Sequence, residues 1–366
     1  MVWNWQLPEP EWPQFTYGHS QIAAKERQFL LGLGNTFAFL KNAAAEERSQ
    51  FIVEILSAEG LESAKIEGEI LERKSLQSSI KRHLGIQADC TKATKKESAM
   101  AELLCSVYAT FEKPLTHEML WQWHSILFKE DSTLSDKGKY RTHPEPMQIV
   151  SGRLDSPQVF FEAPPSSQVF DEMEQFIQWF NATNDSESIL GRAAIAHVYF
   201  ESIHPFEDGN GRIGRILAEK ILSQGAGQPL LIAVSKFLEK QKKDYYAELG
   251  KCNQTLEASD WVDFFADKLL QAQNDSMHLL HFLIQKSKIL TTLSGQINPR
   301  QEKALLRMFA EGPEGFAGGL SAENYRSITK GTRATATRDL ADLVEKGALV
   351  RTGELRYTRY WLNLEI

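Results

Sequence analysis

The sequence predicts a mainly α-helical protein that carries one small β-hairpin and ends in a winged helix-turn-helix unit. Apolar residues recur at helical spacing over most of the 366 residues,. Strand-like alternation is confined to a stretch within residues 139–163 and to the last twenty residues. The chain is longer than one ordinary compact domain, so we expect two or three units.

Composition narrows the class of protein. Hydrophobic residues make up 42% and charged residues 24%, which is typical of globular chains,. A net charge of -7 argues against a protein that coats nucleic acid, although it does not exclude a local basic patch,. Cys90, Cys105 and Cys252 lie far apart without a CxxC or Cys/His cluster, so neither a disulfide framework nor a zinc site is expected,.

No targeting or membrane signal stands out. The chain starts without a basic segment followed by an apolar run, and no apolar stretch approaches the length of a membrane span,. We therefore expect a cytoplasmic protein with no membrane partner.

Residues 1–96 are predicted to form an N-terminal helical region. Its first twenty residues are rich in Trp and Pro (Trp3, Trp5, Trp12, Pro8, Pro10 and Pro13) and indicate an extended segment pinned by aromatic side chains,. A helical pattern follows from about residue 21 to residue 82. Within a helix at about 57–72, "SAKIEG" places Ser63 and Glu67 at i and i+4 on one face,. Taken alone, this face is typical of a solvated surface helix.

Residues 97–265 are predicted to form the core. Two helices are expected between 97 and 129, divided at Lys113-Pro114, and Thr116 suits the N-cap of the second,. Runs at 148–150 and 158–161 predict a β-hairpin around Ser151-Gly152. The next helix is expected to bury Val169, Met173, Phe176, Ile177 and Phe180. A nearly apolar helix at about 188–203 is predicted to be central and buried.

Residues 266–296 are predicted to be a linker helix, followed by a winged helix-turn-helix over 297–366. There, a helical stripe ends at Gly347 and two alternating runs flank Thr352-Gly353,. Between 326 and 359 there are eight Lys or Arg and four Asp or Glu residues, a net of +4. Basic side chains on the expected recognition helix and wing are Arg333, Arg338, Arg351, Arg356 and Arg359. Winged helices contact DNA or serve as protein-docking and dimerisation units, and both roles remain open.

The chemistry of the chain concentrates in "HPFEDGNGRIGR", residues 204–215, between two predicted helices. Gly209 and Gly211 allow close approach of the backbone to a ligand, and the helix that follows offers free N–H groups to an anion. Arg212 and Arg215 are three residues apart, so both were expected to project from one face of the first turn and to suit a polyphosphate. Asp208 is suited to hold a divalent cation.

Two further residues complete this prediction. His204 has the ordinary pKa of a general base, and Phe206 is expected to be a buried anchor. No GxxxxGK[ST] sequence occurs, so the segment indicates a nucleotide-phosphate site that is not a Walker loop,.

The segment matches in full the HxFx(D/E)GNGRxxR signature of the Fic family, and residues 97–265 resemble that family's helical core. The resemblance implies a protein adenylyltransferase, a nucleotidyltransferase that moves AMP from ATP to a Ser, Thr or Tyr hydroxyl of a target protein. It implies that His204 is the base and that Asp208 holds Mg²⁺ or Mn²⁺. The nucleotide site would include Phe206, Gly209, Asn210, Gly211, Arg212 and Arg215.

The resemblance also implies regulation. "SAKIEG" matches the family's inhibitory pattern (S/T)xxxE(G/N), which makes Ser63, Glu67 and Gly68 an inhibitory element whose glutamate pairs with Arg215. In some relatives this glutamate supports removal of AMP instead. The hairpin at 148–161 would dock the target, and self-adenylylation and a homodimer are further expectations. The rival interpretation is a winged-helix DNA-binding regulator whose Fic core senses nucleotide.

Overall fold

The computed structural model describes residues 11–87, 94–129, 133–153, 156–182 and 188–364, with the backbone alone over 149–160. Cys90, Trp3, Trp5, Pro8 and Pro10 therefore lie outside the described residues. Trp12 lies within them and pins the N-terminal segment, because its indole N–H donates to Glu172 (3.0 Å) and its ring packs edge-on to Tyr199. None of the described helices is both long enough and apolar enough to cross a membrane.

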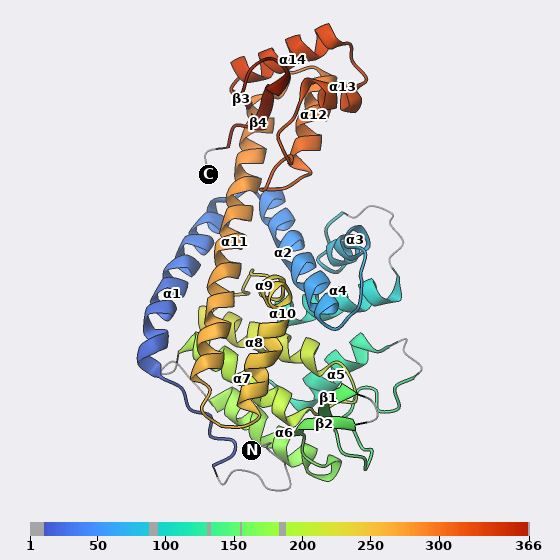
Figure 1. Cartoon of the computed structure of the whole chain (residues 1–366), viewed down its shortest axis with the longest axis vertical. Coiled ribbons are helices and arrows are strands. Elements are labelled where there is room, and N and C mark those ends of the chain that lie inside the picture. The colour runs from blue at the N-terminus through green and yellow to red at the C-terminus, as the bar shows by residue number, and fades with distance from the viewer. Residues whose placement is uncertain (1–10, 88–93, 130–132, 154–155, 183–187, 365–366) are drawn as a thin grey trace. The chain divides into compact units, whose positions relative to one another are not determined.

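The chain is mainly helical, as predicted. The described helices up to residue 292 are α1 (His19–Asn42), α2 (Ala45–Ile66), α3 (Arg73–His83), α4 (Lys95–Thr110), α5 (His117–Leu127), α6 (Ser166–Ala182), α7 (Ile189–Ile203), α8 (Asn210–Ala226), α9 (Ser235–Lys240), α10 (Lys242–Cys252) and α11 (Ser259–Thr292) (Figure 1). Thr116 caps α5 by accepting from Met119 N–H, which confirms that start signal,. All five apolar residues predicted on α6 are buried.

Two compact units divide the chain: residues 1–37 with 52–274, and residues 38–51 with 275–366. This differs from the predicted boundaries at 96 and 265. Val53 and Leu56 of α2 share one apolar cluster with Met100 and Leu104 of α4, so the N-terminal region and the core fold together. The predicted linker helix is part of one continuous helix, α11, whose residues belong to both units.

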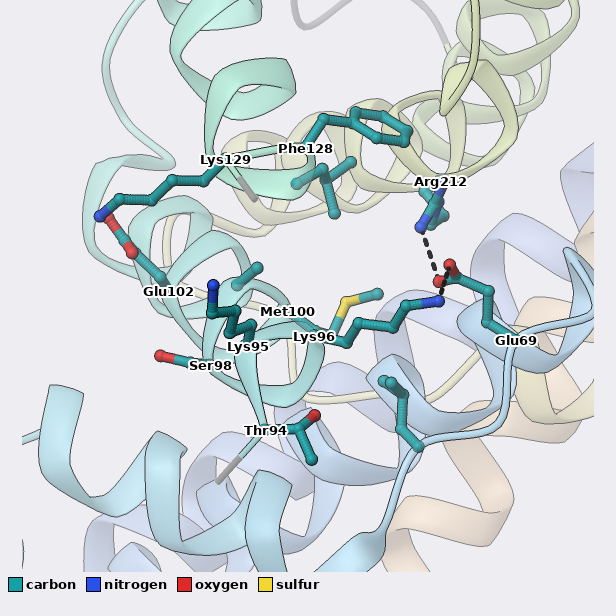
Figure 2. Close-up of a pocket in the computed structure, with 13 residues that line it drawn as sticks. Glu69, Thr94, Lys95, Lys96, Ser98, Met100, Glu102, Phe128, Lys129 and Arg212 are labelled. Carbon is teal, nitrogen blue, oxygen red and sulfur yellow. Dashed lines mark hydrogen bonds and ion pairs between the residues drawn. The ribbon is translucent and has the colours of Figure 1, made fainter. Parts of the chain in front are cut away.

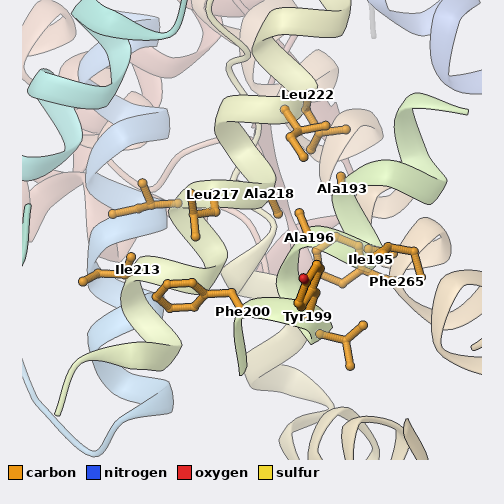
Figure 3. Close-up of a cluster of buried hydrophobic side chains, with 14 of the residues drawn as sticks. Ala193, Ile195, Ala196, Tyr199, Phe200, Ile213, Leu217, Ala218, Leu222 and Phe265 are labelled. Atoms are coloured by element: carbon orange, nitrogen blue, oxygen red, sulfur yellow. The ribbon is translucent and has the colours of Figure 1, made fainter. Parts of the chain in front are cut away.

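The centre of the first unit is the pair α7 and α8. Almost every residue of α7 is buried, as predicted from its apolar sequence,. Figure 3 shows the small side chains Ala193 and Ala196 among larger ones such as Leu217, so the two helices approach closely,. On another side, α1 runs beside the first part of α11 (Figure 1), where Lys25 bonds Asp263 (2.7 Å).

The predicted β-hairpin is present but longer than expected. Strands β1 (Gln148–Arg153) and β2 (Ser156–Glu162) pair antiparallel, with Gln148 opposite Glu162 and Arg153 opposite Ser156. Pairing thus continues through Ser151-Gly152, where the turn was predicted, as far as Arg153 and Ser156.

The second unit contains α12 (Pro299–Phe309), α13 (Ala322–Thr329), α14 (Arg333–Glu345) and the antiparallel strands β3 (Leu349–Thr352) and β4 (Arg359–Leu362). Leu320 also forms a bridge with Tyr360 of β4. Gly347 ends α14 as predicted, in the left-handed conformation with Ala348 N–H bonded to Leu343 O,. The hairpin connection runs from 353 to 358 and is longer than the predicted turn at Thr352-Gly353. Membership of the winged-helix class stays a prediction.

Candidate active site

The motif occupies the connection between α7 and α8 and the first two turns of α8. His204 ends α7 in the left-handed conformation (φ 50°). Gly209 precedes α8 with φ 82°, and a Cβ there would lie 2.6 Å from Phe128 Cε2, so this position requires glycine,. The N–H groups at the start of α8 have no partner inside the helix and face the end of the loop. The start of α8 therefore presents backbone N–H donors of the kind that anions accept.

The loop is held rigid by side chains that were predicted to bind nucleotide. Phe206 is fully buried and stacks on His124 with ring centroids 4.2 Å apart. Asn210 is also buried, and its amide accepts from Phe206 N–H (3.0 Å) and donates to Phe206 O (2.8 Å). Phe206 is thus the predicted anchor and is not among the residues that line the cavity described below, and its role toward nucleotide stays a prediction.

Arg141 is a second anchor, which the sequence analysis did not single out. It is 1% exposed, and its Nε donates to His204 O (2.8 Å) while Nη1 donates to Ser166 Oγ (3.0 Å). Its Nη2 donates to Pro164 O (2.5 Å). Nothing in the local sequence "KYRTH" marks this arginine as buried, so only the fold identifies it.

A cavity of about 750 Å³ opens over the motif, within the size range of small-molecule sites,. Its lining includes His204, Asp208, Gly209, Asn210, Gly211, Glu67 and Glu201. Tyr245 and Tyr246 also line it. Tyr246 is half exposed, and Tyr245 is buried with its hydroxyl 2.7 Å from His197 Nε2.

His204 is positioned as a neutral imidazole. Burial lowers its pKa to about 4, so the ring carries no proton charge at neutral pH,. Its Nδ1 lies 3.3 Å from Glu201 O and 3.7 Å from the Glu201 carboxylate. A proton on Nδ1 is shared with these oxygens and leaves Nε2 as the proton acceptor.

Arg215 is buried and is hydrogen-bonded by Ser63 of α2 and by Glu67 in the turn that follows α2, while its Nη1 has no partner among the described residues. Its Nε donates to Ser63 Oγ (3.0 Å), and its Nη2 donates to Ser63 O (3.0 Å) and to Glu67 Oε1 (2.8 Å). A Cβ on Gly211 would lie 2.3 Å from Glu67 Oε1, so glycine at 211 lets the glutamate approach the start of α8. The structure therefore places Ser63 and Glu67 against Arg215, as the sequence analysis predicted.

The inhibitory element differs in detail from the prediction. Helix α2 ends at Ile66, so Glu67 lies in the turn beyond the helix and not on its face. Gly68 adopts φ 80°, a conformation that a helix cannot continue,. The turn carries Glu67 over the start of α8.

Arg212 has different partners from Arg215. Its Nη1 donates to Glu69 Oε2 (2.8 Å), its guanidinium carbon lies 5.0 Å from the Phe128 ring centroid, and it lines a different cavity from the other motif residues. The prediction that both arginines lie in the first turn is wrong, because Arg215 lies in the second turn and the two side chains bond different glutamates; their role toward phosphate stays a prediction. Glu69 was missed, although "EGE" places it two residues after Glu67.

Asp208 lies at the rim of the cavity with a 63% exposed side chain. Among the described residues, no group of three or more His, Cys, Asp and Glu side chains gathers to form a protein-only metal site. One exposed carboxylate fits a hard cation that takes its other ligands from phosphate oxygens and water, as Mg²⁺ commonly does.

Together, the fold and the site define a helical protein in which a glycine-flanked helix start and a neutral histidine line one cavity. Residues 114–222 match the model of the Fic/DOC family, and residues 3–86 match a domain of unknown function (DUF4172). The chain therefore contains a Fic domain.

Named relatives support this assignment. The chain is 28% identical over 140 residues to protein adenylyltransferase fic-1 of Caenorhabditis elegans, covering 35% of this chain and 26% of that protein. It is 32% identical over 121 residues to protein adenylyltransferase Fic of Drosophila ananassae, covering 31% of this chain and 23% of that protein. The matches thus span about a quarter of the length of these relatives.

Solved structures support the fold alone. A Fic family protein from Desulfovibrio desulfuricans G20 superposes with a TM-score of 0.56 at 22% identity, covering 96% of this chain and 98% of that one. A Fic domain containing signaling protein from Bacteroides thetaiotaomicron gives a TM-score of 0.52 at 20% identity, covering 71% of this chain and 96% of that one.

Proposed function

We propose that this chain is a protein adenylyltransferase that transfers AMP from ATP to a Ser, Thr or Tyr hydroxyl of a target protein. The observation that carries the proposal is the placement of a neutral His204 and the backbone of residues 209–211 around one cavity. A group that accepts a proton and a group that stabilises a developing anion are what this displacement requires. The names of the matched relatives support the same reaction class.

In the proposed reaction, the target hydroxyl gives its proton to His204 Nε2 as its oxygen bonds the α-phosphorus. The bond from that phosphorus to the bridging oxygen breaks, and pyrophosphate leaves. The backbone at Gly209 and Gly211 stabilises the charge on the α-phosphate, and Arg212 and Arg215 bind the outer phosphates. Mg²⁺ or Mn²⁺, held by Asp208, neutralises phosphate charge when bound.

We propose further that the chain is autoinhibited. Arg215 bonds Ser63 and Glu67 in the arrangement described above, so it is withheld from the γ-phosphate. One charge-assisted hydrogen bond contributes about 1.5–3 kcal/mol. This corresponds to a change of about 10- to 150-fold in the fraction of the chain that can bind nucleotide productively. The hairpin of β1 and β2 is the proposed docking site for the target.

The test is transfer of label from ATP labelled at the α-phosphate to protein, with the chain itself as the first acceptor. His204→Ala should abolish transfer because the base is lost. Glu67→Gly should raise transfer by about 10- to 150-fold because Arg215 is released. Equal labelling by wild type and His204→Ala would contradict the proposed mechanism.

Removal of AMP is the alternative activity of the same cavity. Glu67 is favoured for it because its carboxylate lines the cavity and is 28% exposed, within reach of a water molecule. Under this alternative, Glu67→Gly abolishes loss of AMP from a modified protein. The third possibility, a DNA-binding regulator with a silent nucleotide-sensing core, predicts that ATP binds but that no label moves.

A further inference from the structure

A second cavity, of about 600 Å³, lies next to the motif and shares no lining residue with the first. Figure 2 shows its lining residues, which come from α4, the end of α5, the segment after α2 and the start of α8. The charged side chains around it are Lys95, Lys96, Lys129, Arg212, Glu69 and Glu102.

The chemistry of this lining favours a small organic anion. Four cationic side chains face two carboxylates, a net of +2 in a chain of net charge -7. Leu71, Met100 and Phe128 supply apolar surface beside the charges. Cavities of this size with an apolar wall and a few placed charges are typical of small-molecule sites.

One carboxylate of the chain already bridges the cations at one edge. Glu69 accepts from Lys96 Nζ (2.9 Å) and from Arg212 Nη1 (2.8 Å), as the dashed lines in Figure 2 mark. Arg212 is almost fully buried, and its Nε has no partner among the described residues. Glu69 therefore occupies the place that an anionic ligand would compete for.

Glu69 is coupled to the inhibitory glutamate by the backbone. Glu67 N–H and Glu69 N–H both donate to Ala64 O (3.0 and 2.9 Å), so one closed turn carries both carboxylates. Glu67 binds Arg215 and Glu69 binds Arg212 from that turn. Displacing Glu69 therefore strains or opens the turn that holds Glu67.

We propose that this second cavity binds a small organic anion, carrying phosphate or carboxylate groups, between Lys95, Lys96 and Lys129. The bound anion draws Lys96 away from Glu69 and repels the Glu69 carboxylate, so the turn 67–69 leaves Arg212 and Arg215. The cavity is then an effector site that relieves inhibition. The effect on activity rests on the proposed function, whereas the binding site does not.

The test uses the full chain without nucleotide and two probes, phenyl phosphate and benzene-1,3,5-tricarboxylate, titrated by calorimetry. Lys95→Ser/Lys129→Ser should weaken binding about tenfold or more because two charge-assisted contacts are lost. Lys74→Ser/Lys240→Ser is the matched control: it removes the same charge from exposed positions that line neither cavity and should leave the affinity unchanged. Comparing the probes shows whether phosphate or carboxylate is preferred.

Amide hydrogen exchange supplies a readout independent of activity. Either probe should speed exchange at residues 67–69 in wild type but not in Lys95→Ser/Lys129→Ser. Absence of binding, or equal weakening in both double variants, would overturn the proposal. If binding and exchange behave as expected while even Glu67→Gly transfers no label, the proposed activity fails and the anion site stands.

Discussion

At the scale of single residues, Ser63 is the less obvious of the two residues that hold Arg215 in the proposed inhibited state. Its hydroxyl and its carbonyl both accept from the guanidinium. Ser63→Ala removes the hydroxyl acceptor and leaves Nε without that partner, so we expect label transfer to rise about 3- to 10-fold, less than in Glu67→Gly. Ser57→Ala, a buried serine on the same helix that does not bond Arg215, is the control. A rise of the same size in both variants would show that a general loosening of α2 is the cause.

Glu201 gives the site a pH dependence of stability. Burial, and then repulsion by Glu67, raises its pKa from 4.5 to about 8. Between these values the folded chain keeps a proton that the unfolded chain has lost, so wild-type stability falls as pH rises through this window. Glutamine does not titrate. We therefore expect the free energy of unfolding of Glu201→Gln, relative to wild type, to rise on the order of 3 kcal/mol from pH 5 to pH 8.

Denaturant unfolding of both proteins at the two pH values measures this difference. If the free energies of unfolding of Glu201→Gln and wild type differ by the same amount at pH 5 and pH 8, the pKa of Glu201 in the folded chain is close to its ordinary value.

The sequence predicted the residues of the site better than their partners. His204, Asp208, Gly209 and Gly211 line one cavity because they are close in sequence and share one loop. Arg141 and Glu69 contact the motif from 63 and 143 residues away, and neither has a local pattern that distinguishes it from a surface charge. Long-range pairing of this kind depends on the packing of α2 and α5 around α8, which no local spacing encodes.

At the scale of elements, the connection between α7 and α8 depends on Arg141. Its planar guanidinium reaches four acceptors in different directions: His204 O, Ser166 Oγ, Pro164 O and Ile203 O. The single ammonium of lysine cannot match this geometry. We expect Arg141→Lys to lower the free energy of unfolding by about 2–4 kcal/mol and to weaken nucleotide binding.

The matched control is Arg73→Lys at an exposed arginine paired with Glu54, for which we expect a change within about 0.5 kcal/mol,. Equal losses in the two variants, measured by denaturant unfolding, would contradict an anchoring role for Arg141.

Element types were predictable, whereas their ends were less so. The N-cap at Thr116 and the end of α14 at Gly347 follow local rules that single residues satisfy,. The predicted turn of the first hairpin and the predicted length of the second connection were wrong, because strand register depends on cross-strand pairing,. Helix α2 ended at Ile66 because Gly68 takes a positive φ, which the i, i+4 spacing of Ser63 and Glu67 did not reveal.

At the scale of the whole molecule, the division into units could not be predicted from composition. Helices α1, α2 and α11 each contribute residues to both compact units, and no Pro- or Gly-rich linker marks the crossing points. The boundary near 295–299 does correspond to a turn before α12, where Asn298 caps the helix with a capping box,.

The second unit provides the last prediction. Arg333 and Arg338 of α14 and Arg351 and Arg356 of the following hairpin are exposed, within a segment of net charge +4. We expect the full chain to bind duplex DNA weakly at low salt, with a slope of log affinity against log salt of roughly -4 if these four contact phosphates. Arg333→Ala/Arg338→Ala should reduce that slope by about 2. Lys303→Ala/Arg307→Ala, which removes the same charge from exposed positions of α12, should not change it. An electrophoretic shift assay measures binding. If it detects no complex at low salt, or if both double variants lose affinity alike, α14 does not bind DNA. The role that remains for its surface is protein docking, and nucleotide transfer is then independent of DNA.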